Sequence, residues 1–469
     1  MDGNLARLLS DAVQRYGERP VLRCADAVLS YAALDEVSAR VAGLLQERGV
    51  GPGDRVGIML PNVWYFPVVY YGVLRTGAVV VPMNVLLKAR EVAFYLADAQ
   101  ASLLFAWHGF ADQAQVGAAQ AGVDLVAVEP GSFEALMATT EPAREVLGRV
   151  DTDTAVILYT SGTTGTPKGA ELTHANLRRN AEVTRRLFSL GPEDVVAGAL
   201  PLFHSFGQTC SLNATIAGGG SLALLTRFDP TTALELIQRE RITVFMGVPT
   251  MYTALLGQPD RHTWDVSSLH LCISGGAALP VEILHGFEAA YGCLVLEGYG
   301  LSETSPVACF NHPGRLRKPG SIGTPVEGVQ MKVIDEAGRD LPLGAVGEIT
   351  IRGHNVMKGY WRRPTETTAV LSYDGWLRTG DLGRVDAEGY FFIVDRKKDL
   401  IIRGGYNVYP REIEEVLYEH PAVRECAVIG IPHPELGEEV GAAVALKPGA
   451  RVSEQELGRY VKGQVAAYK

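Results

Sequence analysis

The chain has 469 residues, a length that suggests about three domains or subdomains. Its 43 Lys and Arg residues are outnumbered by 53 Asp and Glu residues, which gives a net charge of −10. Proteins that bind nucleic acid usually carry a basic surface, so this balance disfavours a nucleic-acid partner. A hydrophobic share of 47% and a charged share of 20% are typical of a soluble globular enzyme.

The six cysteines are scattered along the chain, with no C-x-x-C pair that would indicate a zinc site. They are Cys24, Cys210, Cys272, Cys293, Cys309 and Cys426. We therefore expect no disulfide framework, and we expect a cytoplasmic protein. The charges within Met1–Tyr16 are too closely spaced for the apolar core of a signal peptide.

Two long stretches lack charged residues, Val56–Leu74 and Val195–Thr226. The first contains two prolines and an asparagine, a pattern that predicts a buried strand at Val56–Leu60, a turn and a buried helix. The second contains His, Gln and Asn residues and a Gly triplet, which are too polar for the hydrocarbon of a membrane. We expect both stretches to lie in a globular core, and we expect no transmembrane segment.

Short apolar runs then alternate with amphipathic helical stretches. The expected strands are Ala155–Leu158, Val195–Leu200, Ser221–Leu225, Val244–Val248, Leu269–Ser274 and Leu294–Glu297. The expected helices include Pro230–Arg239 and Pro280–Tyr291. Strands that alternate with helices predict α/β sheets with crossover connections.

The pattern changes from Gly338 onward, where glycine-rich, β-prone segments predict a small β subdomain. A third pattern follows Asp395–Asp399 and predicts a compact α+β region. Its expected elements are a helix from Pro410, strands at Cys426–Ile431 and Val440–Leu446, and a helix from Ser453 with a capping box at Glu456. No closing strand precedes Lys469, so we expect this region to be incomplete.

Tyr159–Gly169 is dense in groups that bind phosphate. Its glycines let backbone N–H groups converge, while its hydroxyls and Lys168 add donors for phosphate oxygens. It follows a predicted strand and precedes a helical stretch that starts near Thr173. Pro167 interrupts the pattern of a Walker A loop, and an ordinary Gly/Thr loop is the less favoured alternative.

Four further segments follow in order: Leu200–His204, Glu297–Thr304, Trp376–Asp381, and Asp395–Asp399 with Gly404-Gly405. Together with Tyr159–Gly169 they resemble the motifs of the adenylate-forming superfamily, which includes acyl-CoA synthetases, nonribosomal adenylation domains and firefly-type luciferases. The resemblance covers essentially all of Tyr31–Lys469. It implies an α/β fold with a large N-terminal domain, residues 1–396, that contains two α/β sheets and a small β subdomain. A small mobile α+β C-terminal domain, residues 397–469, would follow.

The resemblance implies an enzyme that uses ATP and Mg²⁺ to convert an acid to an acyl-adenylate and then to a CoA thioester. Attack on the α-phosphate depends on positioning and electrostatic stabilisation. The implied nucleotide-binding residues are Thr160, Ser161, Gly162, Thr163, Thr164, Gly165, Lys168, Gly298, Tyr299, Gly300, Ser302, Asp381 and Arg396. Among them, Tyr299 would lie against adenine, Ser302 would bond the α-phosphate, and Asp381 with Arg396 would hold the ribose.

By the same resemblance, His204, Glu303 and Lys168 are the catalytic candidates. Glu303 and Thr160 would hold the magnesium ion, because carboxylate and hydroxyl oxygens suit a hard cation. The hinge of the mobile domain would be Lys398, and the pantetheine tunnel for CoA would pass Gly404 and Gly405. The family's C-terminal lysine should follow Lys469, so we expect the catalytic tail to be missing from this sequence. A nucleotide-binding pseudo-enzyme is therefore an alternative.

The substrate region Phe203–Thr209 has no acidic residue to pair with an amino acid's ammonium group. The predicted acyl pocket comprises Phe206, Gln208, Val248, Thr250, Gly276 and Ala277. The chain is most similar to bacterial medium- and long-chain fatty acid–CoA ligases, although some of these have a Trp where this chain has Gln208. Chain length and oligomeric state stay open, and an aryl-acid–CoA ligase is the alternative.

Overall fold

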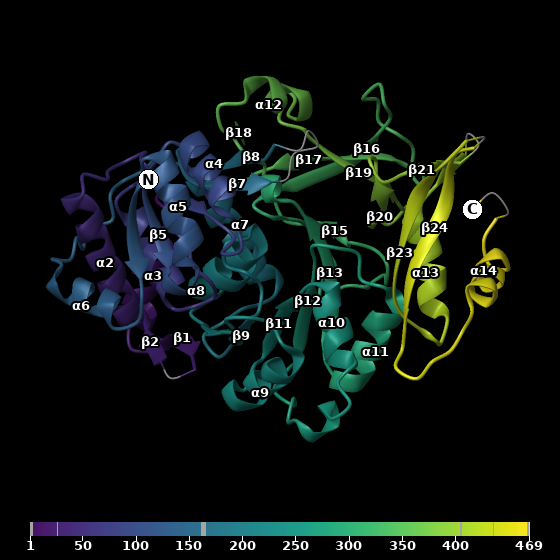
Figure 1. Cartoon of the computed structure of the whole chain (residues 1–469), viewed down its shortest axis with the longest axis horizontal. Helices are drawn as coiled ribbons and strands as arrows, with labels where there is room; N and C mark the ends of the chain where they lie inside the picture. Colours follow the sequence, from purple (N-terminus) through teal and green to yellow (C-terminus); the bar gives the residue numbers. More distant parts are fainter. Residues whose placement is uncertain (1–2, 26, 161–165, 404–405, 435, 467–468) are drawn as a thin grey trace.

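The computed structural model describes residues 3–25, 27–160, 166–403, 406–434, 436–466 and 469. Within these residues the chain forms four sheets, arranged as an N-terminal sheet, a central sheet, a small β subdomain and a C-terminal sheet (Figure 1). The first two are α/β sheets, which confirms the predicted fold class.

The N-terminal sheet has seven strands in the order β18-β8-β7-β4-β3-β5-β6. Its strands are β3 (Arg55–Met59), β4 (Val79–Pro82), β5 (Ala101–Trp107), β6 (Asp124–Val128), β7 (Thr154–Thr160), β8 (Lys168–Thr173) and β18 (Gly359–Tyr360). Its helices are α2 (Tyr31–Glu47), α3 (Tyr65–Arg75), α4 (Ala89–Ala99), η1 (His108–Phe110), α5 (Ala111–Ala121) and α6 (Ser132–Thr139). The uncharged stretch Val56–Leu74 forms the predicted buried strand and buried helix.

The strand β8 was not expected from the sequence. It pairs antiparallel with β7, with Thr160 opposite Lys168, so Lys168 is the first residue of a strand. The short Lys168–Thr173 segment starts with Lys-Gly and contains Glu171, which hides its β character in the sequence. The predicted helix follows as α7 (His174–Leu187), capped by the Thr173 side chain.

The central sheet has nine strands in the order β15-β14-β13-β12-β11-β9-β10-β1-β2. They are β1 (Pro20–Cys24), β2 (Ala27–Ser30), β9 (Val195–Gly198), β10 (Ser221–Leu224), β11 (Val244–Gly247), β12 (Leu271–Ser274), β13 (Leu294–Gly300), β14 (Val307–Phe310) and β15 (Thr324–Pro325). The accompanying helices are α1 (Arg7–Tyr16), η2 (Gly207–Asn213), α8 (Ala214–Gly218), α9 (Pro230–Glu240), α10 (Pro249–Leu256), η3 (Arg261–Thr263), α11 (Val281–Tyr291) and η4 (Ser302–Thr304). The strands β11, β12 and β13 are parallel, so their carboxyl ends meet at one edge.

The β subdomain is an antiparallel sheet in the order β16-β17-β19-β20. Its elements are β16 (Val329–Ile334), β17 (Gly347–Gly353), α12 (Pro364–Val370), β19 (Leu377–Val385) and β20 (Phe391–Arg396). It starts at Val329, before the glycine-rich change at Gly338, because β16 has an ordinary alternating composition that the sequence does not set apart. One hydrophobic core joins this subdomain to both α/β sheets.

The C-terminal sheet has the order β22-β21-β24-β23. Its elements are β21 (Ile401–Arg403), β22 (Tyr406–Val408), α13 (Pro410–Glu419), β23 (Val423–His433), β24 (Gly437–Leu446) and α14 (Glu454–Lys462). The predicted helix start at Pro410 and the Ser453–Glu456 capping box are both confirmed. This region has its own small core, separate from that of the rest of the chain.

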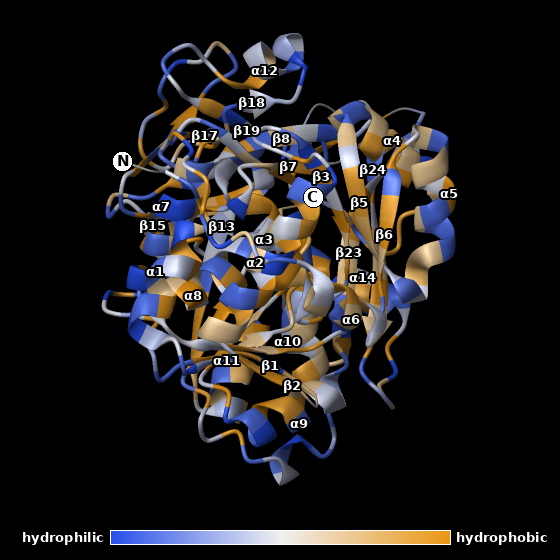
Figure 2. Cartoon of the chain, turned by 90° about the vertical axis from the view of Figure 1, so that its left-hand side faces the viewer, coloured by the Kyte–Doolittle hydropathy of each residue, from blue (hydrophilic) through white to orange (hydrophobic). Residues whose placement is uncertain are grey.

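Hydrophobic residues follow the strands of the sheets, while hydrophilic residues gather on the outer faces of the helices (Figure 2). In the part of the chain that the structure describes, no helix combines the length and the apolar character needed to cross a membrane. All six cysteines are free thiols, but Cys272 and Cys293 lie with their sulfurs 3.4 Å apart. Burial raises the pKa of Cys272, which keeps this thiol protonated and unreactive.

Candidate functional site

Three chain segments meet at the carboxylate of Glu303. Thr160, at the end of β7, donates its hydroxyl to Glu303 Oε1 at 3.2 Å. Tyr360, on β18, donates to the same oxygen at 3.0 Å. The backbone oxygen of Glu303 accepts Met357 N at 2.8 Å, which fixes η4 against this region. The structure therefore brings together the two predicted magnesium ligands.

The chemistry of this group fits a hard cation. Its donors are carboxylate and hydroxyl oxygens, which Mg²⁺ prefers, and Mg²⁺ usually takes few ligands from the protein. Burial and the Glu303 carboxylate raise the pKa of Tyr360, so the phenol stays protonated as a donor. Lys168 Nζ lies 5.5 Å from the centre of the Tyr360 ring, which places a cation beside the same group. Among the described residues, no cluster of three or more His, Cys, Asp and Glu side chains is placed to hold a metal.

A second group joins Tyr299 on β13 to the β subdomain. The Tyr299 hydroxyl donates to Asp381 Oδ2, and Arg396 Nε lies 3.4 Å from Asp381 Oδ1. Asp381 and Arg396 are directly opposite each other on β19 and β20. Burial raises the pKa of Asp381, while the Tyr299 hydroxyl and the Arg396 guanidinium oppose that rise. One hydrogen bond and one ion pair thus connect three predicted nucleotide-binding residues.

The glycines on either side of Tyr299 are required by packing. A Cβ on Gly298 would lie 2.2 Å from the Phe310 ring. A Cβ on Gly300 would lie 1.9 Å from the Pro306 carbonyl oxygen. Packing against the Phe310 ring and the Pro306 backbone therefore accounts for both glycines, whatever further role they have towards a nucleotide.

His204 lies just before η2. Its Nδ1 accepts Phe206 N at 3.1 Å, so the neutral ring carries its proton on Nε2. The side chain reaches solvent, yet the protein atoms around it desolvate it and lower the pKa of His204. The hydroxyl oxygens of Ser205 and Ser302 are 3.5 Å apart, which joins this segment to the Glu303 motif.

The six residues of the predicted acyl pocket fall into separate environments. Phe206 and Gln208 are buried near His204. The Phe206 ring packs against Gly275, where an added Cβ would lie 3.2 Å from the ring. Val248 likewise lies 3.4 Å from the position of a Cβ on Gly276. Thr250 and Ala277 are exposed and line a cavity of about 190 Å³ that they share with the C-terminal region. The structure does not bring these two residues together with Gln208.

The remaining predicted residues are located as follows. Lys398 is exposed in the turn between β20 and β21, which suits a hinge position. The residues Ser161, Gly162, Thr163, Thr164, Gly165, Gly404 and Gly405 lie outside the described residues.

Sequence reasoning missed Tyr360 as a member of the site, and it assigned no role to the Glu297 side chain. Tyr360 is 57 residues from Glu303, and nothing in its local pattern indicates the contact. Glu297 had a signal in the sequence, because it is an acid that directly follows the apolar run of a buried strand. A carboxylate at such a position needs a partner or a raised pKa.

A family model described as "AMP-binding enzyme" matches residues 9–361. A second, described as "AMP-binding enzyme C-terminal domain", matches residues 412–469.

The chain is similar to several characterised proteins over almost its full length. It is 38% identical to a long-chain-fatty-acid–CoA ligase of Bacillus subtilis (strain 168), covering 99% of this chain and 89% of that protein. It is 39% identical to a feruloyl-CoA synthase of an Amycolatopsis species, covering 96% and 90%. The crystal structure of ATP-bound MatB from Rhodopseudomonas palustris superposes with a TM-score of 0.94 at 38% identity, covering 100% of this chain and 93% of that one.

Proposed function

Since this chain belongs to the AMP-binding enzyme family and is an ATP-dependent acid–CoA ligase, we propose that the acid it activates is a fatty acid. The observation that carries this proposal is the uncharged stretch that starts at β9. It folds into η2, α8 and β10, is almost entirely buried, and runs past His204. An acyl chain bound along such a stretch would leave water. The similarity to a long-chain-fatty-acid–CoA ligase adds support.

We assign the nucleotide to the two hydrogen-bonded groups. Tyr299, Asp381 and Arg396 would hold the adenosine, because a buried carboxylate with an adjacent guanidinium can accept both ribose hydroxyls. Glu303 and Thr160 would hold a magnesium ion, which would neutralise charge on the phosphate oxygens. Substrate oxygens and water would complete the metal's coordination.

His204 would orient the acid, since its Nε2–H is a donor beside the Ser205–Ser302 contact. Lys168 would add positive charge near the phosphates. We place the boundary between a large domain, residues 1–396, and a mobile domain, residues 397–469, with Lys398 as the hinge. The C-terminal region has its own hydrophobic cluster, separate from the three clusters of the preceding residues, and this supports the division. We place CoA at Gly404 and Gly405, and the enzyme in the cytoplasm, in line with its free thiols.

The test is a panel of saturated acids, scored by pyrophosphate release with ATP and Mg²⁺ and then by thioester formation with CoA. Each methylene buried in an apolar pocket contributes up to about 0.8 kcal/mol, or roughly fourfold in affinity. We expect kcat/KM to rise with chain length and then level off. Equal activity across the series would contradict a fatty acid substrate.

An aryl acid is the second candidate, favoured by the 39% identity to a feruloyl-CoA synthase. Benzoate and cinnamate derivatives in the same panel decide between the two. A preference for aromatic acids with no dependence on aliphatic chain length would establish this alternative.

A further inference from the structure

Glu297 is a buried acid that no part of the proposed reaction uses. It lies on β13, two residues before Tyr299, and its side chain is 2% exposed. Its Oε1 accepts Leu279 N at 3.0 Å. Its Oε2 is buried and has no hydrogen-bond partner among the described residues. A buried carboxylate oxygen without a partner is costly, so this atom calls for an explanation.

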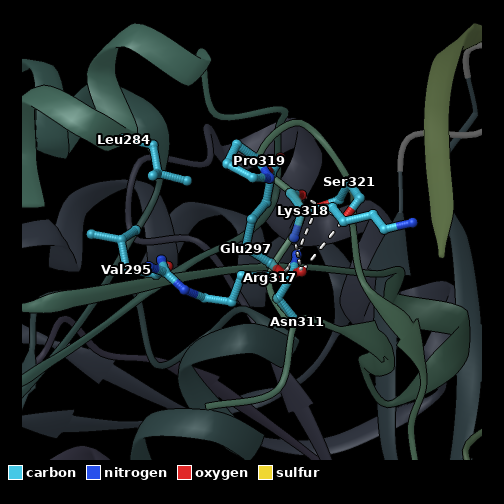
Figure 3. A pocket seen from close by; sticks show the side chains of 8 residues that line it. All are labelled: Leu284, Val295, Glu297, Asn311, Arg317, Lys318, Pro319 and Ser321. Carbon is cyan, nitrogen blue, oxygen red and sulfur yellow. Dashed lines mark hydrogen bonds between the residues drawn. The ribbon is translucent and has the colours of Figure 1, made fainter. Parts of the chain in front are cut away.

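A small cavity of about 10 Å³ borders this carboxylate (Figure 3). Polar side chains of Asn311, Arg317, Lys318 and Ser321 contribute to its lining. A volume of this size holds one water molecule, and a polar lining gives that water its partners. One water molecule in this cavity would therefore give Glu297 Oε2 a hydrogen-bond partner.

The bond to Leu279 anchors a segment that borders the site. Gly275–Leu279 leaves the carboxyl end of β12, which runs parallel to β13 with Ser274 opposite Glu297. A Cβ on Gly275 would lie 3.2 Å from the Phe206 ring and 3.7 Å from Gly298 O. The segment thus packs between the proposed acyl region and the strand of Tyr299. Ligands of α/β sheets bind at this edge.

We propose that Glu297 is a positioning residue: its carboxylate fixes Gly275–Leu279 against β13 through Leu279 N, one water satisfies its second oxygen, and loss of its charge loosens the segment and weakens nucleotide binding. The proposal rests on the family's nucleotide binding and is independent of which acid the enzyme activates.

The surroundings allow the charge to change near neutral pH. Burial raises the pKa of Glu297 to about 7, while Arg411 and the Leu279 N–H oppose the rise and Glu415 adds to it. Arg317 and Lys318 also line the cavity, and each is paired with another acid. An ionised carboxylate accepts a hydrogen bond more strongly than a protonated one. The segment is therefore held more firmly above pH 7 than below it.

The experiment measures AMP binding by calorimetry between pH 6 and pH 8 for the wild type, Glu297→Gln and Glu288→Gln. The Gln variant of Glu297 keeps the shape and the acceptor of the protonated form. The affinity ratio of wild type to Glu297→Gln cancels the titration of AMP itself. We expect a ratio near one at pH 6 and about fivefold at pH 8.

Glu288 is the matched control. It accepts Val295 N at 2.8 Å and pairs with Arg317, so it also holds a backbone N–H beside this cavity, but it does not hold Gly275–Leu279. The ratio of AMP affinities of the wild type and Glu288→Gln should stay constant across the pH range. A pH-independent ratio for Glu297→Gln, or the same pH dependence in both variants, would overturn the proposal.

Amide hydrogen exchange supplies a second measurement that needs neither a variant nor an acid substrate. In the wild type, exchange at Leu279, corrected for its intrinsic pH dependence, should slow with a midpoint near pH 7, while helix α7 shows no such midpoint. Absence of that midpoint would overturn the proposal even if every acid in the panel failed. A failure of the fatty acid assignment alone would leave it untouched.

Discussion

Replacing Gln208 by Met should stabilise the protein. Gln208 is 0% exposed within η2, and neither Nε2 nor Oε1 has a hydrogen-bond partner among the described residues. Each buried, unsatisfied polar group costs about 1–3 kcal/mol. Met is unbranched, similar in size and free of strong polar atoms, so it removes this cost while filling the space. We expect a gain of about 2 kcal/mol in the free energy of unfolding of the large domain.

Urea denaturation of the wild type and Gln208→Met measures this change, with Asn180→Leu as the matched control. Asn180 is also a buried amide, but it donates to Val307 O at 2.8 Å and accepts Val307 N at 3.0 Å. Its replacement should destabilise the protein by about 2 kcal/mol or more, because it leaves a buried donor and acceptor unpaired. A loss of more than about 1 kcal/mol in Gln208→Met would refute the reasoning.

The same variant reports on the acyl region. One helical turn separates Gln208 from His204, whose backbone oxygen accepts Gln208 N at 3.0 Å. If the acyl chain passes this turn, an apolar side chain should raise kcat/KM for longer saturated acids relative to shorter ones. An unchanged ratio would place the acyl chain elsewhere.

Three further outcomes are expected. Glu303→Gln should reduce Mg²⁺-dependent adenylate formation far more than AMP binding, and equal losses would remove Glu303 from the metal site. Lys398→Pro should restrict the hinge, so that adenylate formation survives better than thioester formation in separate half-reaction assays. Burial raises the pKa of Glu297 from its usual 4.5 to about 7, and global unfolding would solvate the carboxylate. The free energy of global unfolding should therefore fall as the pH rises from 4.5 through 7, even though the ionised carboxylate binds Leu279 N more strongly within the folded protein. Urea titrations should show that the free energy of unfolding of the wild type is up to about 3 kcal/mol lower at pH 8 than at pH 5, relative to Glu297→Gln. The same pH dependence in the wild type and in Glu297→Gln would contradict the assignment.

The buried parallel strands were predictable because they are short apolar runs bounded by Gly, Pro or charged residues. Val244–Gly247 and Leu271–Ser274 are fully buried, so burial leaves a continuous signal in the sequence. The strand β8 is different, because it pairs with β7 while carrying Glu171 and a Lys-Gly start. Its β structure comes from pairing in the hairpin, which no local pattern records.

The site residues likewise divide into those that a local motif identifies and those that only tertiary packing brings together. Thr160 and Glu303 were identified by their motifs, and the structure brings them into contact. The contact of Tyr299 with Asp381 joins residues 82 positions apart, and its geometry depends on how the β subdomain packs on the central sheet. Tyr360 could not be identified at all, because a lone aromatic residue carries no sign of which acid it will meet.

The composition of the uncharged stretch does not show how polar its interior is. The absence of charged residues in Val195–Thr226 predicts an apolar interior, and burial of that stretch agrees with it. Yet Gln208 carries two buried polar atoms without partners into that interior. An uncharged segment is therefore not necessarily an apolar one, and an acyl chain packed against the Gln208 amide would bind less tightly than one packed against an apolar side chain. The chemistry of the acid consequently depends on what satisfies Gln208, which is why that side chain is the first to change.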